Sequence, residues 1–162
     1  MEEKYKIRPV VLEDRDTLSK WWESYDHMLV PSLDLLPEGG RGGFAIEKKG
    51  RMIAAAFVYV TNSDMGYIDF LVSDPNYKGK DKYKILTKLM EACSELAIEL
   101  GCRIVWAMTT YPVMADIAEK MGHDVLDEKY SIIYTHHKAY KSVMEKQENG
   151  KASWSSLFTE SN

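Results

Sequence analysis

The pattern of hydrophobic and polar positions changes its period several times along the first half of the chain. Residues 5–10 alternate as a β-strand does, and the apolar residues that follow recur at the spacing of one helical face, at Leu18, Trp21, Trp22 and Tyr25. After a loop, three apolar segments are separated only by short polar turns, over 44–47, 52–60 and 67–72. The first half therefore predicts a strand, a helix and then three strands that pair antiparallel.

A glycine-rich segment stands between the predicted helix and the second strand. Residues 31–43 hold two prolines and the run Gly39-Gly40-Arg41-Gly42-Gly43, a composition that is typical of loops. A glycine-rich phosphate loop would have to open a helix, whereas these glycines lead into the strand at 44–47. We therefore interpret the segment as a flexible lid or a connection, and not as a phosphate loop.

The second half of the chain carries the longest amphipathic pattern. Apolar residues step by three and four between Leu86 and Leu100, with Leu89, Cys93 and Leu96 among them, which predicts a helix with a buried stripe. Gly101 follows, where a glycine often ends a helix. A buried strand over 103–108, a shorter helix over 113–121 and a last strand over 130–135 complete the series. This order of elements predicts a mixed α/β protein of the α+β class.

Length and composition set the broad class. A chain of 162 residues fits one domain, and no apolar run approaches the roughly 20 residues of a membrane span. The first residues lack the layout of a secretory signal, so we expect a soluble protein of the cytoplasm, or of the host cytoplasm if the chain is viral. The net charge of −4 argues against a broad nucleic-acid surface.

The chain turns polar after the last predicted strand. We expect a domain over 1–137 and a polar extension over 138–162. Three apolar residues near the end of this extension can dock on the domain, Trp154, Leu157 and Phe158. A polar tail can equally be mobile, and the sequence leaves the two alternatives open.

Cysteines and histidines show no pattern of a metal site or of a nucleophile. Cys93 and Cys102 are expected to be small buried hydrophobes, because cytosolic disulfides are rare. The four histidines are scattered, and His136 and His137 would point to opposite faces of a strand. We therefore expect no metal site. The chain also lacks a Gly-x-Ser-x-Gly nucleophile elbow, which argues against a hydrolase.

The order of elements resembles that of the GNAT N-acetyltransferase superfamily over residues 5–135. The likeness is carried by four stretches, Leu35-Leu36-Pro37, Ala55-Ala56-Phe57, Val72-Ser73-Asp74-Pro75 and Lys120-Met121-Gly122-His123. Among GNAT proteins the chain is most similar to the small GNAT-like proteins common in bacteriophage genomes. The resemblance implies the GNAT fold, a central, mostly antiparallel twisted sheet of six to seven strands flanked by helices, with acetyl-CoA as cosubstrate.

The pyrophosphate motif of the family falls on residues 76–81 of this chain. The motif is Gln or Arg, two residues, Gly, one residue, then Gly or Ala, and only Gly79 matches it. In such a loop, backbone N–H groups and the start of the following helix bind phosphate. An Asp at position 81 is unfavourable beside an anion unless it turns away as the helix N-cap. The resemblance implies a cofactor site made of Lys78, Gly79, Lys80, Asp81 and Lys82, and of the strand end at Leu71, Val72 and Ser73.

Four lysines within seven residues can compensate for the missing glycines. Their ammonium groups suit the pyrophosphate and the 3′-phosphate of coenzyme A, at Lys78, Lys80, Lys82 and Lys84. A solvated charge cluster on an exposed turn is the alternative.

The catalytic residues that the resemblance implies are Asp69 and Tyr111. Asp69 is the only acid between positions 67 and 72, on the strand where the family often places a general base, and an ordinary strand carboxylate is the alternative. Strand alternation would put Asp69 and Leu71 on one face. The tyrosine that often acts as the acid falls on Ala118, so Tyr111 is the nearest substitute, with a packing role as its alternative. Tyr130 has less support.

The resemblance implies an N-acyltransferase that moves an acetyl group from acetyl-CoA directly to a primary amine. The alternative is a GNAT-fold binding or inhibitory protein without acyl transfer, which the lost glycines and the missing tyrosine favour. The sequence does not identify the amine acceptor, and it leaves open whether the chain forms a homodimer.

Overall fold

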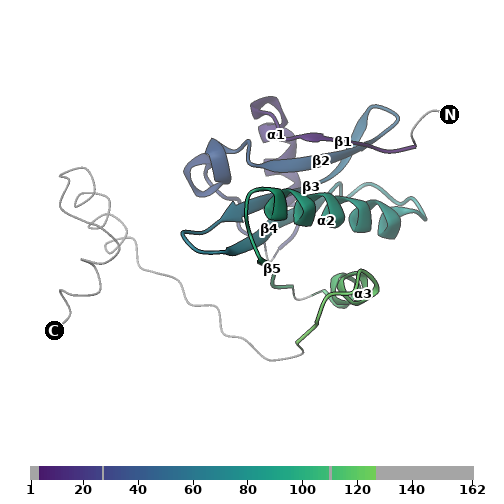
Figure 1. Cartoon of the computed structure of the whole chain (residues 1–162). Helices are drawn as coiled ribbons and strands as arrows, with labels where there is room; N and C mark the ends of the chain where they lie inside the picture. Colours follow the sequence, from purple (N-terminus) through teal and green to yellow (C-terminus); the bar gives the residue numbers. More distant parts are fainter. Residues whose placement is uncertain (1–3, 27, 110, 127–162) are drawn as a thin grey trace, which may run out of the picture. The chain divides into compact units, whose positions relative to one another are not determined.

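The computed structural model describes residues 4–26, 28–109 and 111–126. Within these ranges, five strands form one sheet in the order β1-β2-β3-β4-β5 (Figure 1). Adjacent strands are antiparallel, except that β4 and β5 are parallel. The strands are β1 (Lys6–Pro9), β2 (Gly43–Lys48), β3 (Arg51–Val60), β4 (Met65–Ser73) and β5 (Ile104–Trp106). The expected α+β class and the mostly antiparallel sheet are confirmed, while the strand expected at 130–135 lies outside the described residues.

Three α-helices accompany the sheet, α1 (Arg15–Glu23), α2 (Lys82–Glu99) and α3 (Pro112–Lys120). Short 3-10 turns add η1 (Leu12–Asp14), η2 (Leu33–Leu35) and η3 (Pro37–Gly39). The buried residues of α1 pack on one face of the sheet, and those of α2 and α3 pack on the other. The sheet is therefore the middle layer between two hydrophobic cores.

The glycine-rich segment is a connection that is held at fixed points. Two 3-10 turns, η2 and η3, occupy it, and Tyr59 of β3 donates its hydroxyl to the Leu35 carbonyl at 2.9 Å. The backbone is left-handed at three successive residues, Glu38, Gly39 and Gly40, with φ of 51°, 61° and 92°. Glycine reaches this region without a Cβ clash, so the two glycines serve a sharp reversal of the chain that leads into β2.

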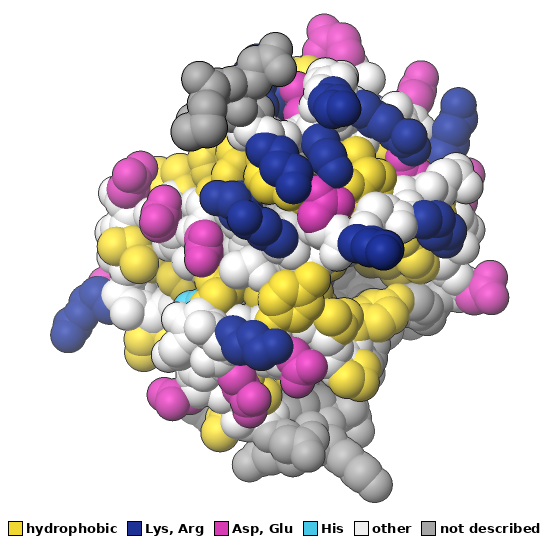
Figure 2. All heavy atoms as spheres, turned by 90° about the vertical axis from the view of Figure 1, so that its right-hand side faces the viewer, with side chains coloured by type: hydrophobic (Ala, Val, Ile, Leu, Met, Phe, Trp, Pro, Cys, Tyr) yellow, Lys and Arg dark blue, Asp and Glu magenta, His cyan; other side chains and the backbone are white. Residues whose placement is uncertain are grey.

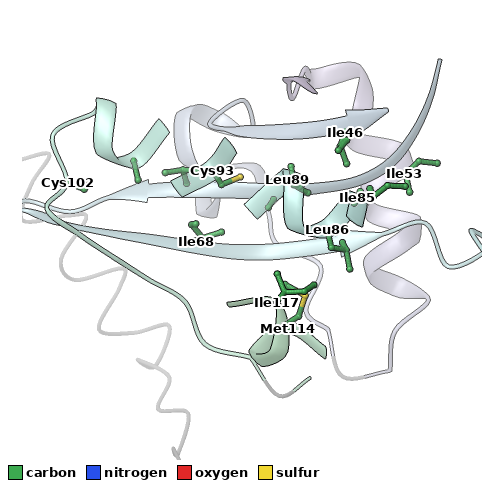
Figure 3. Packing of buried hydrophobic residues seen from close by; sticks show 14 residues of the cluster. Ile46, Ile53, Ile68, Ile85, Leu86, Leu89, Cys93, Cys102, Met114 and Ile117 are labelled. Carbon is green, nitrogen blue, oxygen red and sulfur yellow. The ribbon is translucent and has the colours of Figure 1, made fainter. Parts of the chain in front are cut away.

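The core between α2 and the sheet accounts for most of the apolar stripe expected on this helix. Figure 3 shows the buried side chains of α2 directed at the sheet, and five are buried, Ile85, Leu86, Leu89, Cys93 and Ala97. Leu96 is only half-buried and Leu100 is 55% exposed, so the expected burial was wrong for these two. Leu100 is the C-cap residue, and the chain turns away at Gly101, with φ of 97°.

The core on the other face is built around α1 and the middle of β3. Leu18, Trp21 and Trp22 are the buried residues of α1. The side chains of β3 alternate between the two cores, because Ala54 and Ala56 belong to the α2 side, whereas Ala55 and Phe57 belong to the α1 side. Strand β3 is therefore buried on both faces, which explains its continuous apolar run.

Strand β5 differs from the buried strand expected over 103–108. It covers only Ile104–Trp106, and Ile104 and Trp106 are 61% and 44% exposed. The reason is its place at the edge of the described sheet, where β4 pairs with one side of it and no described strand pairs with the other.

Replacing Leu89 with Ala should lower the free energy of unfolding by ~2–5 kcal/mol, because Leu89 is fully buried and the change leaves a cavity. Urea unfolding followed by circular dichroism measures the loss. Leu100→Ala on the same helix is the matched control and should cost under ~0.5 kcal/mol, since Leu100 is exposed. Equal losses in both variants would contradict the assignment of Leu89 to the core.

Candidate functional site

Strand β5 pairs over its whole length with the beginning of β4. Met65, Gly66 and Tyr67 of β4 face Ile104, Val105 and Trp106 of β5 in parallel register. Strand β5 ends there, whereas β4 continues to Ser73 beside β3. Among the described residues, the β5-side edge of β4 has no strand partner beyond Tyr67. Backbone groups of Leu71, Val72 and Ser73, which the sequence predicts to hold the cofactor, lie in this part of β4.

A β-bulge interrupts β4 in the same region. The register passes from Phe57–Asp69 to Ala55–Val72, so that Phe70 and Leu71 lie opposite the single residue Ala56. The extra residue is accommodated by a left-handed backbone at Phe70, with φ of 52°. This conformation is uncommon for a bulky residue, and bulges of this kind gather next to active sites.

Side chains from two elements hold the bulge. Asp69 accepts a hydrogen bond from the backbone N–H of Phe70 through Oδ1 at 2.7 Å, and Trp22 of α1 donates its indole N–H to the Phe70 carbonyl at 3.3 Å. The Trp22 and Phe70 rings also meet edge to face, with centroids 6.1 Å apart. These contacts thus hold the left-handed backbone at Phe70 in place. Backbone conformations of this kind persist only where the surrounding structure fixes them, and they cluster at functional sites.

The bulge corrects the side-chain directions that strand alternation predicts. Leu71 packs against the core on the α2 side, whereas Phe70 and Val72 pack on the α1 side. Asp69 bonds to Tyr67, whose ring stacks on the α1 side of the sheet. The expectation that Asp69 and Leu71 share one face is therefore wrong, because the extra residue shifts the alternation after Asp69.

Asp69 lies among aromatic rings on the α1 side of the sheet. Tyr67 donates its hydroxyl to Asp69 Oδ2 at 3.0 Å, and its ring lies 5.9 Å from that of Tyr59 and 4.8 Å from that of Trp106. Burial and the negative charge of Asp69 raise the pKa of Tyr67 to about 12. The pKa of Tyr59 is raised by the same two causes. Both tyrosines are therefore neutral hydroxyls around one half-buried carboxylate.

Tyr111 lies near the C-terminal end of β4. It is the N-cap residue of α3 and is 40% exposed. Burial raises the pKa of Tyr111 above its ordinary value, and the electrostatic interaction with Tyr25 raises it further. Tyr25 in turn donates its hydroxyl to the carbonyl of Ser73 at 3.1 Å. Tyr111 therefore interacts electrostatically with a tyrosine that is bonded to the C-terminal end of β4. Ala118, in the usual place of the acid, is a half-buried residue of α3.

The loop between β4 and α2 carries the lysine cluster at an uncapped helix start. Lys78, Lys80 and Lys84 are exposed and Lys82 is half-exposed. Lys78 donates to the Pro75 carbonyl at 3.0 Å. The Asp81 side chain does not cap the N-terminus of α2, and the backbone N–H of Lys82 donates to the Gly79 carbonyl at 3.1 Å. The positive end of the helix dipole and the N–H groups of Tyr83 and Lys84 are therefore what this helix start offers to an anion. Figure 2 shows basic side chains gathered at this end of the molecule.

Asp81 stands at the N-cap position, as expected, but its side chain does not cap the helix. Its two oxygens instead accept hydrogen bonds from Tyr77 at 2.5 Å, from Tyr5, which precedes β1, at 2.8 Å and from Lys48 of β2 at 2.6 Å. These donors, Lys48 first, hold the pKa of the Asp81 carboxyl well below its usual range. The sequence suggests one way for this carboxylate to avoid an anion, as a side-chain cap of the helix; the carboxylate instead pairs with Lys48, Tyr77 and Tyr5.

A family model described as the acetyltransferase (GNAT) family matches residues 8–122. The chain belongs to the GNAT acetyltransferase family. No curated protein sequence matches it.

Solved structures with the same fold have diverged far in sequence. Rv2747 of Mycobacterium tuberculosis, in complex with CoA, is 16% identical over 91% of this chain and 86% of its own, with a TM-score of 0.61. An aminoglycoside acetyltransferase from an uncultured soil sample, in complex with sisomicin, is 18% identical over 82% and 97%, with a TM-score of 0.59. The ribosomal-protein-S18-alanine N-acetyltransferase of Escherichia coli is 16% identical over 73% and 76%, with a TM-score of 0.58. These similarities establish the GNAT fold of the chain.

The candidate site contains residues that the sequence analysis missed. Tyr5, Lys48 and Tyr77 all donate to Asp81. Tyr77 is a local partner, four positions before Asp81, whereas Tyr5 and Lys48 come from distant segments. Trp22 meets the bulge at Phe70 from 48 positions away. No spacing rule signals the distant contacts, because they depend on how the first strands pair and on the packing of α1 on the sheet.

The structure also bears on the expectations about cysteine, metal and membrane. Cys93 and Cys102 are buried free thiols, and burial raises the pKa of Cys93 to about 12, which excludes it as a nucleophile at neutral pH. Within the described ranges, no three His, Cys, Asp or Glu residues come together as metal ligands. No helix of the described part combines the length and apolar character of a membrane span.

Proposed function

We propose that this GNAT protein transfers the acetyl group of acetyl-CoA to a primary amine. The observation that carries the proposal is the half of β4 that runs beyond β5, bulged at Phe70 and followed by the uncapped basic start of α2. A thioester needs backbone donors without a strand partner, and its phosphates need cations and a helix N-terminus. Both requirements are met along one continuous segment, residues 68–84.

The cofactor is held by the two ends of this segment. Backbone groups of Leu71, Val72 and Ser73 bind the pantetheine and the thioester. Four residues of the loop and helix start bind the phosphates, Lys78, Gly79, Lys80 and Lys82. Asp81 contributes through its backbone at the helix start, since its carboxylate is occupied by Lys48, Tyr77 and Tyr5.

Asp69 and Tyr111 supply the proton transfers. The Asp69 carboxylate first takes one proton from the bound ammonium, directly or through one water. The neutral nitrogen then bonds to the acetyl carbon and the carbon–sulfur bond breaks. The second nitrogen proton passes to solvent, and the Tyr111 hydroxyl gives a proton to the departing sulfur. Support for Tyr111 comes from its link through Tyr25 to the carbonyl of Ser73. Solvent then restores both residues.

An ammonium-bearing acceptor suits the surroundings of Asp69. A carboxylate attracts the ammonium form, and aromatic faces such as those of Tyr67 and Trp106 attract cations as well. The rings of Tyr59 and Tyr67 border this carboxylate, and Trp106 is 44% exposed beside Tyr67. These features support a primary amine and disfavour an anionic acceptor.

The same proposal covers the cellular location of the protein, the division of its chain and its oligomeric state. We place it in the cytoplasm and relate it to the small GNAT-like proteins of bacteriophages. The catalytic domain spans 1–137 and 138–162 form an extension. The proposal is compatible with a monomer or a homodimer.

Replacing Lys78 and Lys80 together with Ala should weaken CoA binding at least tenfold, which is ~1.4 kcal/mol, because two cations leave the phosphate site. Titration calorimetry with CoA measures this affinity, and added salt should weaken the wild type more steeply than the double variant. Equal CoA affinities of the wild type and the double variant would indicate that Lys78 and Lys80 belong to a solvated charge cluster.

The same purified protein tests the function itself. Acetyl-CoA should bind and be hydrolysed slowly in the absence of an acceptor. Tight binding without hydrolysis, and without transfer to any amine of a screened panel, would favour the binding or inhibitory alternative. Absence of binding would refute the proposed function.

A further inference from the structure

The network around Asp81 places a negative charge inside the basic phosphate loop and neutralises it there. Asp81 is 17% exposed in its side chain and pairs with Lys48, which is 24% exposed, while Lys4 stands 3.9 Å away. Lys48 also donates to the Tyr77 hydroxyl at 3.0 Å. The described polar partners of the carboxylate, from the segment before β1, from β2 and from the loop itself, are thus all donors or cations.

Without these partners, the Asp81 carboxylate would repel an anion that binds at the loop. It lies at the N-cap of α2, among lysines whose role is to attract an anion, and like charges at such short range repel. The hydrogen bonds from Lys48, Tyr77 and Tyr5 turn it toward the β1–β2 edge of the sheet. In this ion pair the positive charge of Lys48 is offset by the negative charge of Asp81.

The loop is shaped to admit this arrangement. A Cβ at Gly79 would overlap the Tyr77 hydroxyl and approach Asp81 Oδ1 to 2.7 Å. Gly79 is the one position that matches the family motif, and here its lack of a side chain makes room for the Tyr77–Asp81 hydrogen bond. In this chain the glycine therefore serves the network around Asp81.

We propose that Lys48 is a positioning residue of the phosphate site, which acts by holding the Asp81 carboxylate away from the bound phosphates. Tyr77 and Tyr5 complete the clamp. This inference rests on the proposed binding of coenzyme A, and it differs from a direct contact between Lys48 and phosphate. A direct contact would make Lys48 important whatever residue stands at position 81.

A double-mutant cycle separates the two roles, with CoA affinity measured by titration calorimetry. Lys48→Met should weaken binding about tenfold or more, because it removes a cation and releases a carboxylate beside the phosphates. Asp81→Asn should bind at least as tightly as the wild type, since the amide oxygen still accepts from Tyr77 or Tyr5 and the negative charge is gone. The double variant, Lys48→Met with Asp81→Asn, should return to within about threefold of the wild type.

Lys49→Met is the matched control, because Lys49 is the exposed neighbour of Lys48 in the same turn. It should change CoA affinity less than about threefold. Thermal unfolding of each variant checks that the fold is retained.

Each outcome decides between the models. A double variant as weak as Lys48→Met would overturn the positioning role and assign Lys48 to direct phosphate contact. Weaker binding by Asp81→Asn alone would show that the carboxylate supports the site, which also overturns the proposal. A wild-type protein that fails to bind CoA would refute the proposed function and this inference together, whereas wild-type binding with no rescue refutes only the inference.

Discussion

Replacing Asp69 with Asn should lower turnover ~10²–10⁴-fold while fold and CoA affinity are retained, because the base that accepts the amine proton is lost. The amide is a close match for the structural role, since its oxygen can still accept from the Phe70 N–H or from Tyr67. The deficit should shrink at high pH, where the amine loses its proton without help. Steady-state rates across pH, with an identified acceptor, measure both effects.

The control for the Asp69 prediction keeps the carboxylate and removes a partner. Tyr67→Phe deletes the hydroxyl that donates to Asp69 Oδ2 and should cost much less than Asp69→Asn. An Asp69→Asn variant with wild-type turnover at neutral pH would restrict Asp69 to holding the bulge at Phe70. Rate acceleration would then come from the orientation of the two substrates alone.

Replacing Tyr111 with Phe should lower turnover by a comparable factor, ~10²-fold or more, because the departing sulfur loses its proton donor. Burial and Tyr25 raise the pKa of Tyr111, so the hydroxyl stays protonated as pH rises through the ordinary tyrosine value of about 10. The wild type should therefore lose activity only above that pH. Rates between pH 7 and 11 test the expectation.

Tyr25→Phe helps to interpret the Tyr111 result. It removes the hydroxyl that bonds to the Ser73 carbonyl but leaves the proton donor, so we expect a smaller loss than in Tyr111→Phe. A Tyr111→Phe variant with the turnover and pH profile of the wild type would give Tyr111 a packing role only.

The fold could be predicted from the sequence where local pattern and tertiary structure agree. The stripe from Leu86 to Ala97 reflects a single packed face, so period alone places α2. The alternation over residues 5–10 places the first strand, although Lys6–Pro9 is largely exposed. The failures lie at the ends of elements. Leu100 follows the stripe but caps the helix, and the apolar residues of β5 read as core although Ile104 is 61% exposed.

The candidate site was less predictable, because it depends on contacts between distant residues. Strand alternation could not anticipate the bulge at Phe70, which is fixed by Trp22 of α1. The sequence placed Asp81 at the helix start, since Asp favours that position, but the choice between capping the helix and pairing with Lys48 depends on the β1–β2 edge. A phosphate-binding role of Lys78 and Lys80 could be proposed from the sequence, whereas the pairing of Lys48 with Asp81 could not be foreseen.

The two buried cysteines have a practical consequence for measuring the reaction. Cys93 is fully buried and Cys102 is 5% exposed, and they are the only cysteines in the sequence. Thiol reagents attack exposed thiolates, so the two cysteines of the native protein should react with them very slowly. Each coenzyme A thiol released by transfer can then be counted continuously as colour, without quenching the enzyme and without a protein background.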